Sequence, residues 1–190
     1  QRLPLQEAYA DDSTAHASPY GRAKFLGSQK VASSPLGVAL RFFNIYGPRQ
    51  DPRSPYSGVI SKFLDMALGE ESLTVFGDGL QARDFVYVSD VVDAYLLAGG
   101  LQDSFSEVRC GIYNIGTGRS TTILELAEII KALTGNQNAP RFLPERPGDI
   151  RFSLASVEAF SRAAGWRAGR SLRDGLQATL QWYREHRPGK

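Results

Sequence analysis

Strand-like and helix-like patterns alternate along this 190-residue chain, and this alternation restricts the fold more than any other feature. Strands show as short apolar runs, whereas helices show apolar residues three and four positions apart. Alternation of this kind, without repeats, predicts an α/β protein with a parallel sheet. We expect strands near 38–43, 73–76, 83–88 and 112–115. Helices are expected near 19–31, 59–68, 90–97 (capped by Ser89) and from a cap at Thr121 or Thr122 to 133, with a loop over 44–57 and two short helices after 141.

The composition supports a globular core and argues against several functions. Hydrophobic residues make up 42% of the chain, yet no apolar run approaches the roughly 20 residues of a membrane-spanning helix. A net charge of +2 with interspersed signs gives no basic stripe for nucleic acid. With only two histidines and one cysteine, the chain has few of the side chains that form metal sites. The single cysteine, Cys110, cannot form an internal disulfide, so we expect a cytoplasmic protein. From the charge, the apolar runs and the histidines together, we expect no nucleic-acid, membrane or metal partner.

Tyr20 and Lys24 form a Tyr-x-x-x-Lys pair on the first predicted helix. Residues four apart lie on one helix face, so the Lys24 ammonium can approach the Tyr20 phenol. A nearby cation favours the phenolate and lowers the pKa of a tyrosine, which makes it a candidate acid or base. Chance also produces this spacing, so neighbouring motifs must decide between a catalytic and an incidental pair.

Gly116-Thr117-Gly118 lies between a predicted strand and a predicted helix, the context of a dinucleotide-binding loop. Thr121 stands where the third glycine of that fingerprint belongs, and no acidic residue ends a strand about 20 residues later. An ordinary strand-to-helix turn is therefore the preferred interpretation.

Five motifs follow one another in order, namely SPYGRAK (18–24), LRFFNIYGPRQ (40–50), VFGDGLQARDF (75–85), YNIGTG (113–118) and RPGD (146–149). The set resembles the extended short-chain dehydrogenase/reductase family that modifies nucleotide sugars, in particular its 4-epimerases of the UDP-glucose 4-epimerase kind. The resemblance covers essentially the whole chain. It implies NAD as the cofactor and a UDP-sugar as the substrate.

The resemblance assigns a role to each motif. Tyr20 would be the catalytic base, Lys24 would bind the nicotinamide ribose, and Phe43 would lie against the nicotinamide. Asn44, directly after a strand, would contact the substrate near its diphosphate. Arg83 and Arg146 fall at the family's diphosphate-binding arginines, a role that suits the bidentate guanidinium. The remaining substrate-binding positions implied are Val59, Thr74, Val75 and Phe76 along the nucleotide, and the ribose-binding Asp149.

Ser153 bears on the choice of sugar. In related hexose epimerases a tyrosine four residues after the aspartate narrows the sugar pocket and excludes a 2-acetamido group. A serine at this position implies room for N-acetylhexosamines beside, or instead of, plain hexoses.

The resemblance also predicts the organisation of the chain. Residues 1–48 and 116–142 would be the remnant of an NAD-binding Rossmann domain, with an incomplete parallel sheet, and 49–115 and 143–190 a small α/β substrate-binding domain. The family's glycine-rich loop and catalytic Ser or Thr precede the Tyr, so we expect a C-terminal portion that is inactive and binds NAD weakly by itself.

The predicted function is an NAD-dependent nucleotide-sugar 4-epimerase that acts through a transient 4-keto intermediate. One alternative is a nucleotide-sugar 4,6-dehydratase or decarboxylase with the same Tyr-Lys chemistry. A second alternative is a non-catalytic sugar-nucleotide-binding module. The family further implies a homodimer formed through the helix that carries Tyr20.

Overall fold

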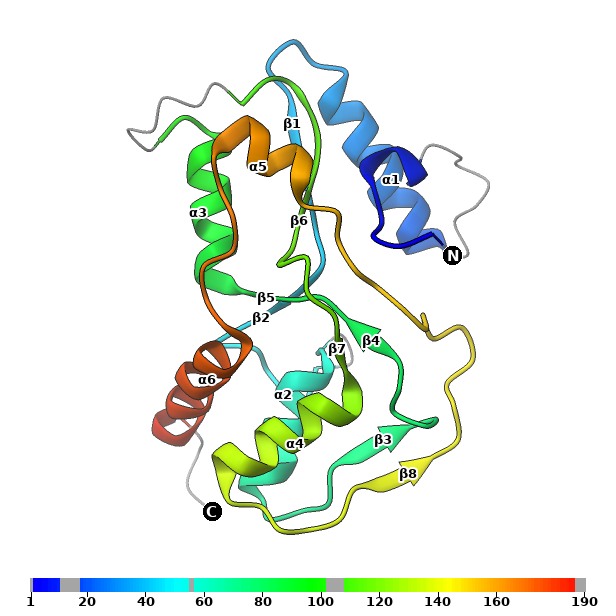
Figure 1. Ribbon diagram of the computed structural model, residues 1–190, viewed down its shortest axis with the longest axis vertical. Coiled ribbons are helices and arrows are strands. Elements are labelled where there is room, and N and C mark those ends of the chain that lie inside the picture. Colours follow the sequence, from blue (N-terminus) through cyan, green and yellow to red (C-terminus); the bar gives the residue numbers. More distant parts are fainter. Residues whose placement is uncertain (1, 11–17, 55–56, 102–107, 187–190) are drawn as a thin grey trace.

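The computed structural model describes residues 2–10, 18–54, 57–101 and 108–186 (Figure 1). Two parallel strands, β1 (Val38–Phe42) and β6 (Gly111–Ile115), run side by side along the upper part of the molecule. Helix α1 (Pro19–Ala32) lies on one side of this pair, while α3 (Val88–Ala98) and α5 (Glu158–Ala164) lie on the other (Figure 1). The predicted α/β class is confirmed.

Alternation along β1 explains these two layers, because successive side chains of a strand point to opposite faces. Leu40 and Phe42 pack against the core that α3 and α5 share with Trp166. Arg41 points the other way, toward α1, where its guanidinium donates to the Ser28 hydroxyl at 2.8 Å. The short 3₁₀ helix η1 (Glu7–Ala10) joins this side, since the Glu7 carboxylate accepts a hydrogen bond from the backbone N–H of Asn114 at 2.9 Å.

Helix α1 begins where the sequence predicts. The Ser18 hydroxyl accepts a hydrogen bond from the Gly21 N–H at 3.1 Å, and Pro19 occupies the first helical position, where its missing N–H costs nothing. The helix ends at Ala32, one residue beyond the expected end.

The expected loop over 44–57 is wrong at its start, because a further strand, β2 (Asn44–Tyr46), directly follows β1. It pairs in parallel with β5 (Phe85–Tyr87). Burial of the Tyr46 side chain explains the strand, since its ring packs edge-on against Phe85 and Tyr87, with centroids 6.4 and 5.4 Å apart. The loop signals from Gly47 and Pro48 apply only after it; residues 55–56 lie outside the described part of the chain.

The expected strand over 83–88 is interrupted. Its first part, β4 (Ala82–Arg83), pairs antiparallel with β7 (Thr121–Thr122), and its second part is β5. Asp84 separates them because its carboxylate binds a neighbouring turn. Helix α3 then starts at Val88 with Tyr87 as its N-cap, so the predicted cap at Ser89 is wrong.

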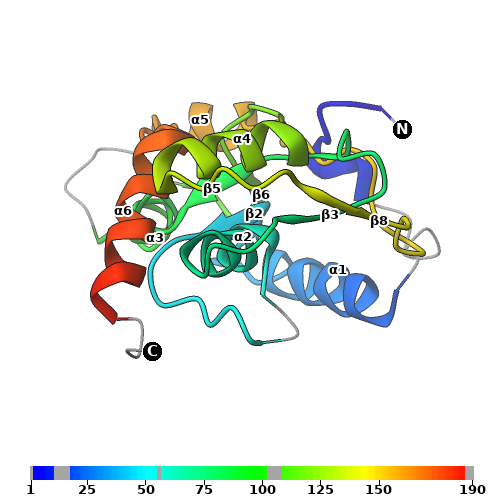
Figure 2. The same ribbon diagram turned by 90° about the horizontal axis from the view of Figure 1, so that it is seen from below.

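The lower part of the molecule is a second α/β unit, seen from below in Figure 2. Helices α2 (Val59–Leu68), α4 (Ile123–Thr134) and α6 (Leu172–His186) share one core with β3 (Thr74–Phe76), which pairs in parallel with β8 (Arg141–Leu143). Of the two candidate caps of helix α4, Thr121 and Thr122, the structure has Thr122, reinforced by Glu125 in a capping box.

Two further expectations concern this unit. Helix α6 has 15 residues, so the prediction of two short helices is wrong for the second; buried Leu176, Leu180 and Tyr183 anchor its length. Helices α2 and α4, which come from different predicted domains, pack together in one core, and the division into two domains stays a prediction.

In the described part of the chain no helix is long and apolar enough to cross a membrane, and no cluster of metal ligands occurs.

Candidate functional site

A cleft of about 500 Å³ lies between α2, β3 and the loop after β8. Seven of the nine predicted substrate-binding residues line it, although they come from segments spread over more than 100 positions: Asn44, Val59, Thr74, Phe76, Arg83, Arg146 and Asp149. The other lining residues are Ser57, Gly58, Lys62, Phe63, Met66, Gln81 and Ile123.

Arg83 and Asp149 form an ion pair at the cleft, with Nη2 2.6 Å from Oδ1. The two side chains are 13% and 29% exposed, which places the pair largely out of solvent. Arg83 also donates from Nη1 to the Ala82 carbonyl oxygen at 2.9 Å. The pair therefore fixes the guanidinium against β4 and leaves only part of its donor fork for a ligand.

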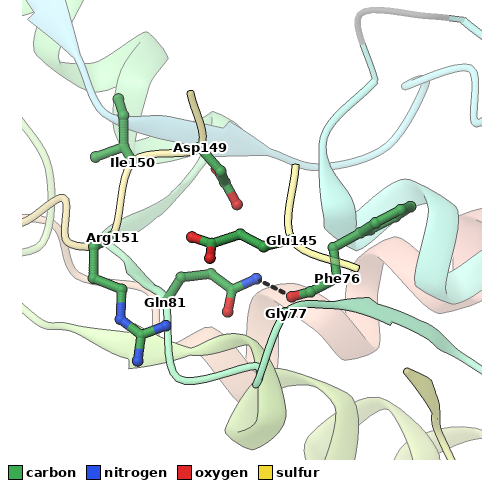
Figure 3. Close-up of a pocket in the computed structure, with 7 residues that line it drawn as sticks. All are labelled: Phe76, Gly77, Gln81, Glu145, Asp149, Ile150 and Arg151. Atoms are coloured by element: carbon green, nitrogen blue, oxygen red, sulfur yellow. Dashed lines mark hydrogen bonds between the residues drawn. The ribbon is translucent and has the colours of Figure 1, made fainter. Parts of the chain in front are cut away.

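Arg146 lies over the ring of Phe76, with its guanidinium carbon 3.7 Å from the ring centroid. This cation–π contact holds a positive charge beside an aromatic face. The Gln81 side chain donates from Nε2 to the Phe76 carbonyl oxygen at 2.8 Å (Figure 3), which fixes the end of β3. A planar base and a phosphate are the groups that such a combination suits.

Arg151 and Asp78 form an ion pair beside the segment that carries Asp149. Two hydrogen bonds of 2.6 and 2.7 Å join the guanidinium to the carboxylate, and they lower the pKa of Asp78 to about 2. Because Asp78 belongs to the turn after β3 and Arg151 lies two residues after Asp149, this pair ties the 145–151 segment to β3. Figure 3 shows Glu145, Asp149 and Arg151 gathered around Gln81.

Strand alternation separates the three predicted residues of β3. Thr74 and Phe76 line the cleft, whereas Val75 points into the core and is fully buried. Only the main chain of Val75 is available to a ligand.

Two predicted residues lie beside the cleft rather than in its lining. Ser153 is half-buried, and its N–H donates to the Ala82 carbonyl at 3.0 Å, next to Arg83. Phe43 joins β1 to β2, and its N–H donates to the Ile115 carbonyl at 3.0 Å. Phe43 immediately precedes Asn44, which does line the cleft.

Tyr20 and Lys24 occupy the exposed side of α1. The Tyr20 side chain is 72% exposed, and the Lys24 ammonium lies 5.4 Å from the centroid of its ring. The predicted proximity of the pair is confirmed. Neither residue lines the cleft.

The turn at Gly116–Gly118 holds one of the protein's own carboxylates. Asp84, which is fully buried, accepts hydrogen bonds from the Thr117 N–H (2.8 Å), the Thr117 hydroxyl (2.7 Å), the Gly118 N–H (2.9 Å) and the Ala155 N–H (3.2 Å). A side chain at Gly116 would place its Cβ 2.8 Å from an Asp84 oxygen. Position 116 therefore needs a glycine because the Asp84 carboxylate occupies the space of a side chain. This agrees with the interpretation of residues 116–118 as an ordinary strand-to-helix turn.

One face of α2 was missed by the sequence reasoning, apart from Val59. Lys62, Phe63 and Met66 line the cleft, and with Val59 they have the i, i+3, i+4, i+7 spacing of one helix face. That spacing, once Val59 was assigned to the site, was the signal that could have found them.

Parallel strands covered by helices, with a cleft that presents arginines and an aromatic ring, define an α/β protein of a Rossmann-like type with a site suited to a phosphorylated, planar ligand. A model of the NAD dependent epimerase/dehydratase family matches residues 1–116. The chain belongs to this family.

Known proteins of this family are similar to the chain over most of its length. A UDP-glucose 4-epimerase of Mycolicibacterium smegmatis is 36% identical over 141 residues, which are 74% of this chain and 43% of the relative. A UDP-N-acetyl-alpha-D-glucosaminuronate decarboxylase of Bacillus cytotoxicus is 35% identical over 152 residues, 77% of this chain and 46% of the relative.

Among solved structures, a UDP-N-acetylglucosamine 4-epimerase of Methanobrevibacter ruminantium in complex with UDP-N-acetylmuramic acid is 34% identical with a TM-score of 0.82. The match covers 96% of this chain and 58% of that chain. The chain spans about half the length of the curated relatives it matches.

Proposed function

We propose that the protein is an NAD-dependent nucleotide-sugar 4-epimerase that acts on UDP-hexoses and UDP-N-acetylhexosamines through a 4-keto intermediate. The observation that carries this proposal is the convergence of Asn44, Arg83, Arg146 and Asp149 on one cleft beside the ring of Phe76. Family membership and the similarity to UDP-sugar 4-epimerases support it.

The cleft supplies the contacts that a UDP-sugar needs. The Phe76 ring and the apolar face of α2 suit a uracil base, and Arg83 with Arg146 suits the diphosphate. Asp149 accepts from Arg83 and retains lone pairs for a ribose hydroxyl. Asn44, the first residue of β2, lines the same cleft and would contact the substrate near its diphosphate.

The residues of this chain fit the nicotinamide end of NAD. Tyr20 and Lys24 present a phenol and an ammonium to solvent on one helix face, a donor set that suits ribose hydroxyls, and Phe43 lies at the junction of β1 and β2. The Gly116–Gly118 turn does not fit the pyrophosphate, because Asp84 already accepts its N–H groups. When bound there, NAD would supply hydride transfer to and from C4 of the sugar.

Tyr20 would take the proton of the sugar 4-hydroxyl and give it back when the C4 configuration has changed. Lys24 would stabilise the phenolate through its positive charge. The small Ser153, beside Arg83, would leave space for a 2-acetamido group. No net oxidation of the sugar results.

The test is turnover by the full-length protein with added NAD, followed by NMR of the products. UDP-glucose should yield UDP-galactose, and UDP-N-acetylglucosamine should yield UDP-N-acetylgalactosamine. Turnover of UDP-glucose without turnover of the acetylated sugar would disprove the Ser153 argument but not the epimerase. If neither substrate turns over although both bind, the non-catalytic binding module becomes the better description.

A second candidate is a nucleotide-sugar decarboxylase or 4,6-dehydratase. The 35% identity to a UDP-N-acetyl-alpha-D-glucosaminuronate decarboxylase favours it, as does the breadth of the family. The NMR assay separates the reactions once a UDP-uronic acid is added to the substrates: a decarboxylase releases CO₂ from the UDP-uronic acid, and a dehydratase converts the UDP-hexose to a 4-keto-6-deoxy sugar.

We also propose that the protein is a cytoplasmic homodimer formed through α1. Leu26 and Val31 on this helix are 49% and 45% exposed, which is consistent with a helix face that a second subunit covers. Light scattering should give twice the monomer mass, and Leu26→Glu should shift it toward the monomer.

A further inference from the structure

Lys62 lines the cleft and has no hydrogen bond or ion pair among the described residues. It lies one turn into α2 and is half-buried. Gly58, the N-cap of this helix, provides no side-chain hydrogen bond to the first turn. Lys62 therefore belongs to the first turn of a helix, whose N-terminal partial positive charge also favours an anion.

An ammonium without a protein partner must keep its donors on water or on a ligand, because an unpaired charge is costly to remove from water. The two arginines of the cleft are already engaged. Arg83 is paired with Asp149 at 2.6 Å, and Arg146 lies over Phe76. Lys62, in contrast, makes no such contact with a described residue, so its donors are available to a ligand.

The balance of charge in the cleft points to the same ligand. Its charged lining residues are three cations, Lys62, Arg83 and Arg146, and one anion, Asp149. The ion pair cancels one positive charge, which leaves two. The diphosphate of a UDP-sugar is a diester with one negative charge on each phosphate, so the two positive charges match it only if Lys62 takes part.

We propose that Lys62 is a further substrate-binding residue that contacts the diphosphate of the UDP-sugar. This inference rests on the proposed function, because it takes the cleft to be the UDP-sugar site. Lys62 thereby completes the phosphate recognition that Arg83, held by Asp149, provides only in part. The competing role is structural: the aliphatic stem of Lys62 would cover Phe63 and Met66 while its ammonium stays in solvent.

The decisive variant is Lys62→Gln, which keeps most of the stem and removes the charge. Lys30→Gln, on the exposed last turn of α1, is the matched control for the loss of one lysine charge. Binding of UDP-glucose, UMP and uridine to the purified protein is measured by calorimetry and NMR titration. Thermal unfolding of each variant without ligand reports any structural effect.

We expect Lys62→Gln to weaken UDP-glucose about tenfold, the cost of one charge-assisted hydrogen bond, with uridine unchanged within about twofold. The salt dependence of UDP-glucose binding should become shallower. Lys30→Gln should match the wild type in both respects.

Equal weakening of uridine and UDP-glucose would overturn the proposal in favour of a contact with the base. Unchanged affinity for all three ligands would assign Lys62 the structural role instead. If wild-type protein binds none of the ligands, the proposed function of the cleft fails, and this outcome is distinct from the failure of Lys62 alone.

Discussion

Arg83 and Asp149, 66 positions apart in the sequence, form the ion pair that ties β4 to the loop beside the cleft. The pair has two consequences. It orients the Arg83 guanidinium toward the cleft, and it offsets the charge of a carboxylate that the proposed function assigns to the ribose. Each residue therefore depends on the other for its position.

Substitution of Arg83 should reduce the affinity for UDP-glucose. Arg83→Gln removes the charge and leaves Asp149 unpaired, so we expect the affinity for UDP-glucose to fall at least tenfold, as measured by calorimetry. Asp149→Asn should weaken binding less, because Arg83 keeps its charge while a ribose contact is reduced. Arg167→Gln, which breaks an exposed ion pair with Glu158, serves as the control and should bind normally. Equal binding by Arg83→Gln and the wild type would contradict the assignment.

Asp84→Asn should destabilise the fold. The carboxylate accepts from four donors, and an amide would oppose some of these N–H groups with its own N–H₂. We expect a loss of about 2–4 kcal/mol in the free energy of unfolding, measured by urea denaturation. Asp93→Asn, on the exposed side of α3, should change it by less than about 0.5 kcal/mol. A similar loss for both variants would show that the buried hydrogen bonds of Asp84 contribute no more to the free energy of unfolding than an exposed carboxylate does.

Residues that belong to motifs were grouped correctly into one cleft, whereas residues that reach the cleft only through tertiary packing were missed. Order and residue type were enough to bring Arg83, Arg146 and Asp149 into one group. Because side chains alternate along a strand, the sequence could have shown that Thr74 and Phe76 lie on one face of β3 and Val75 on the opposite face. Lys62 carries no motif, and only the placement of α2 against the cleft brings it to the site.

The errors in the fold have the same physical origin. Strand β2 is three residues long and depends on pairing with β5, which no local pattern reveals. The break at Asp84 is equally non-local, because its four donors come from segments about 30 and 70 positions away. Helix ends governed by local capping, as at Ser18 and Thr122, were predictable.

Tyr20→Phe tests the proposed catalytic base. The substitution removes the ionisable hydroxyl from an exposed side chain, so folding and UDP-glucose affinity should be unchanged. In the full-length protein with added NAD, we expect kcat for epimerisation to fall by at least about 100-fold with little change in KM. The control is Tyr95→Phe, an exposed tyrosine on α3, which should retain full activity. Comparable kcat values for both variants would exclude Tyr20 as the base.

Two buried phenols should make the protein sensitive to alkaline pH. Burial raises the pKa of Tyr183 to about 12 and raises that of Tyr46 further. Their hydroxyls donate to the carbonyl oxygens of Gln50 and Leu172, so both need their protons in the folded state. An unfolded chain ionises its tyrosines near pH 10 and then binds fewer protons than the folded chain.

This difference in bound protons means that the free energy of unfolding falls as the pH rises. The two phenols contribute stability that is fully present below about pH 10 and is lost as the pH rises toward 12. Urea denaturation at a series of pH values should show the free energy of unfolding falling through this range. Tyr183→Phe should be less stable at neutral pH, by about 1 kcal/mol for the lost hydrogen bond, and should lose less stability per pH unit above 10. The Tyr95→Phe control should keep the wild-type slope, and an unchanged slope in Tyr183→Phe would rule out this residue as a source of the alkaline sensitivity.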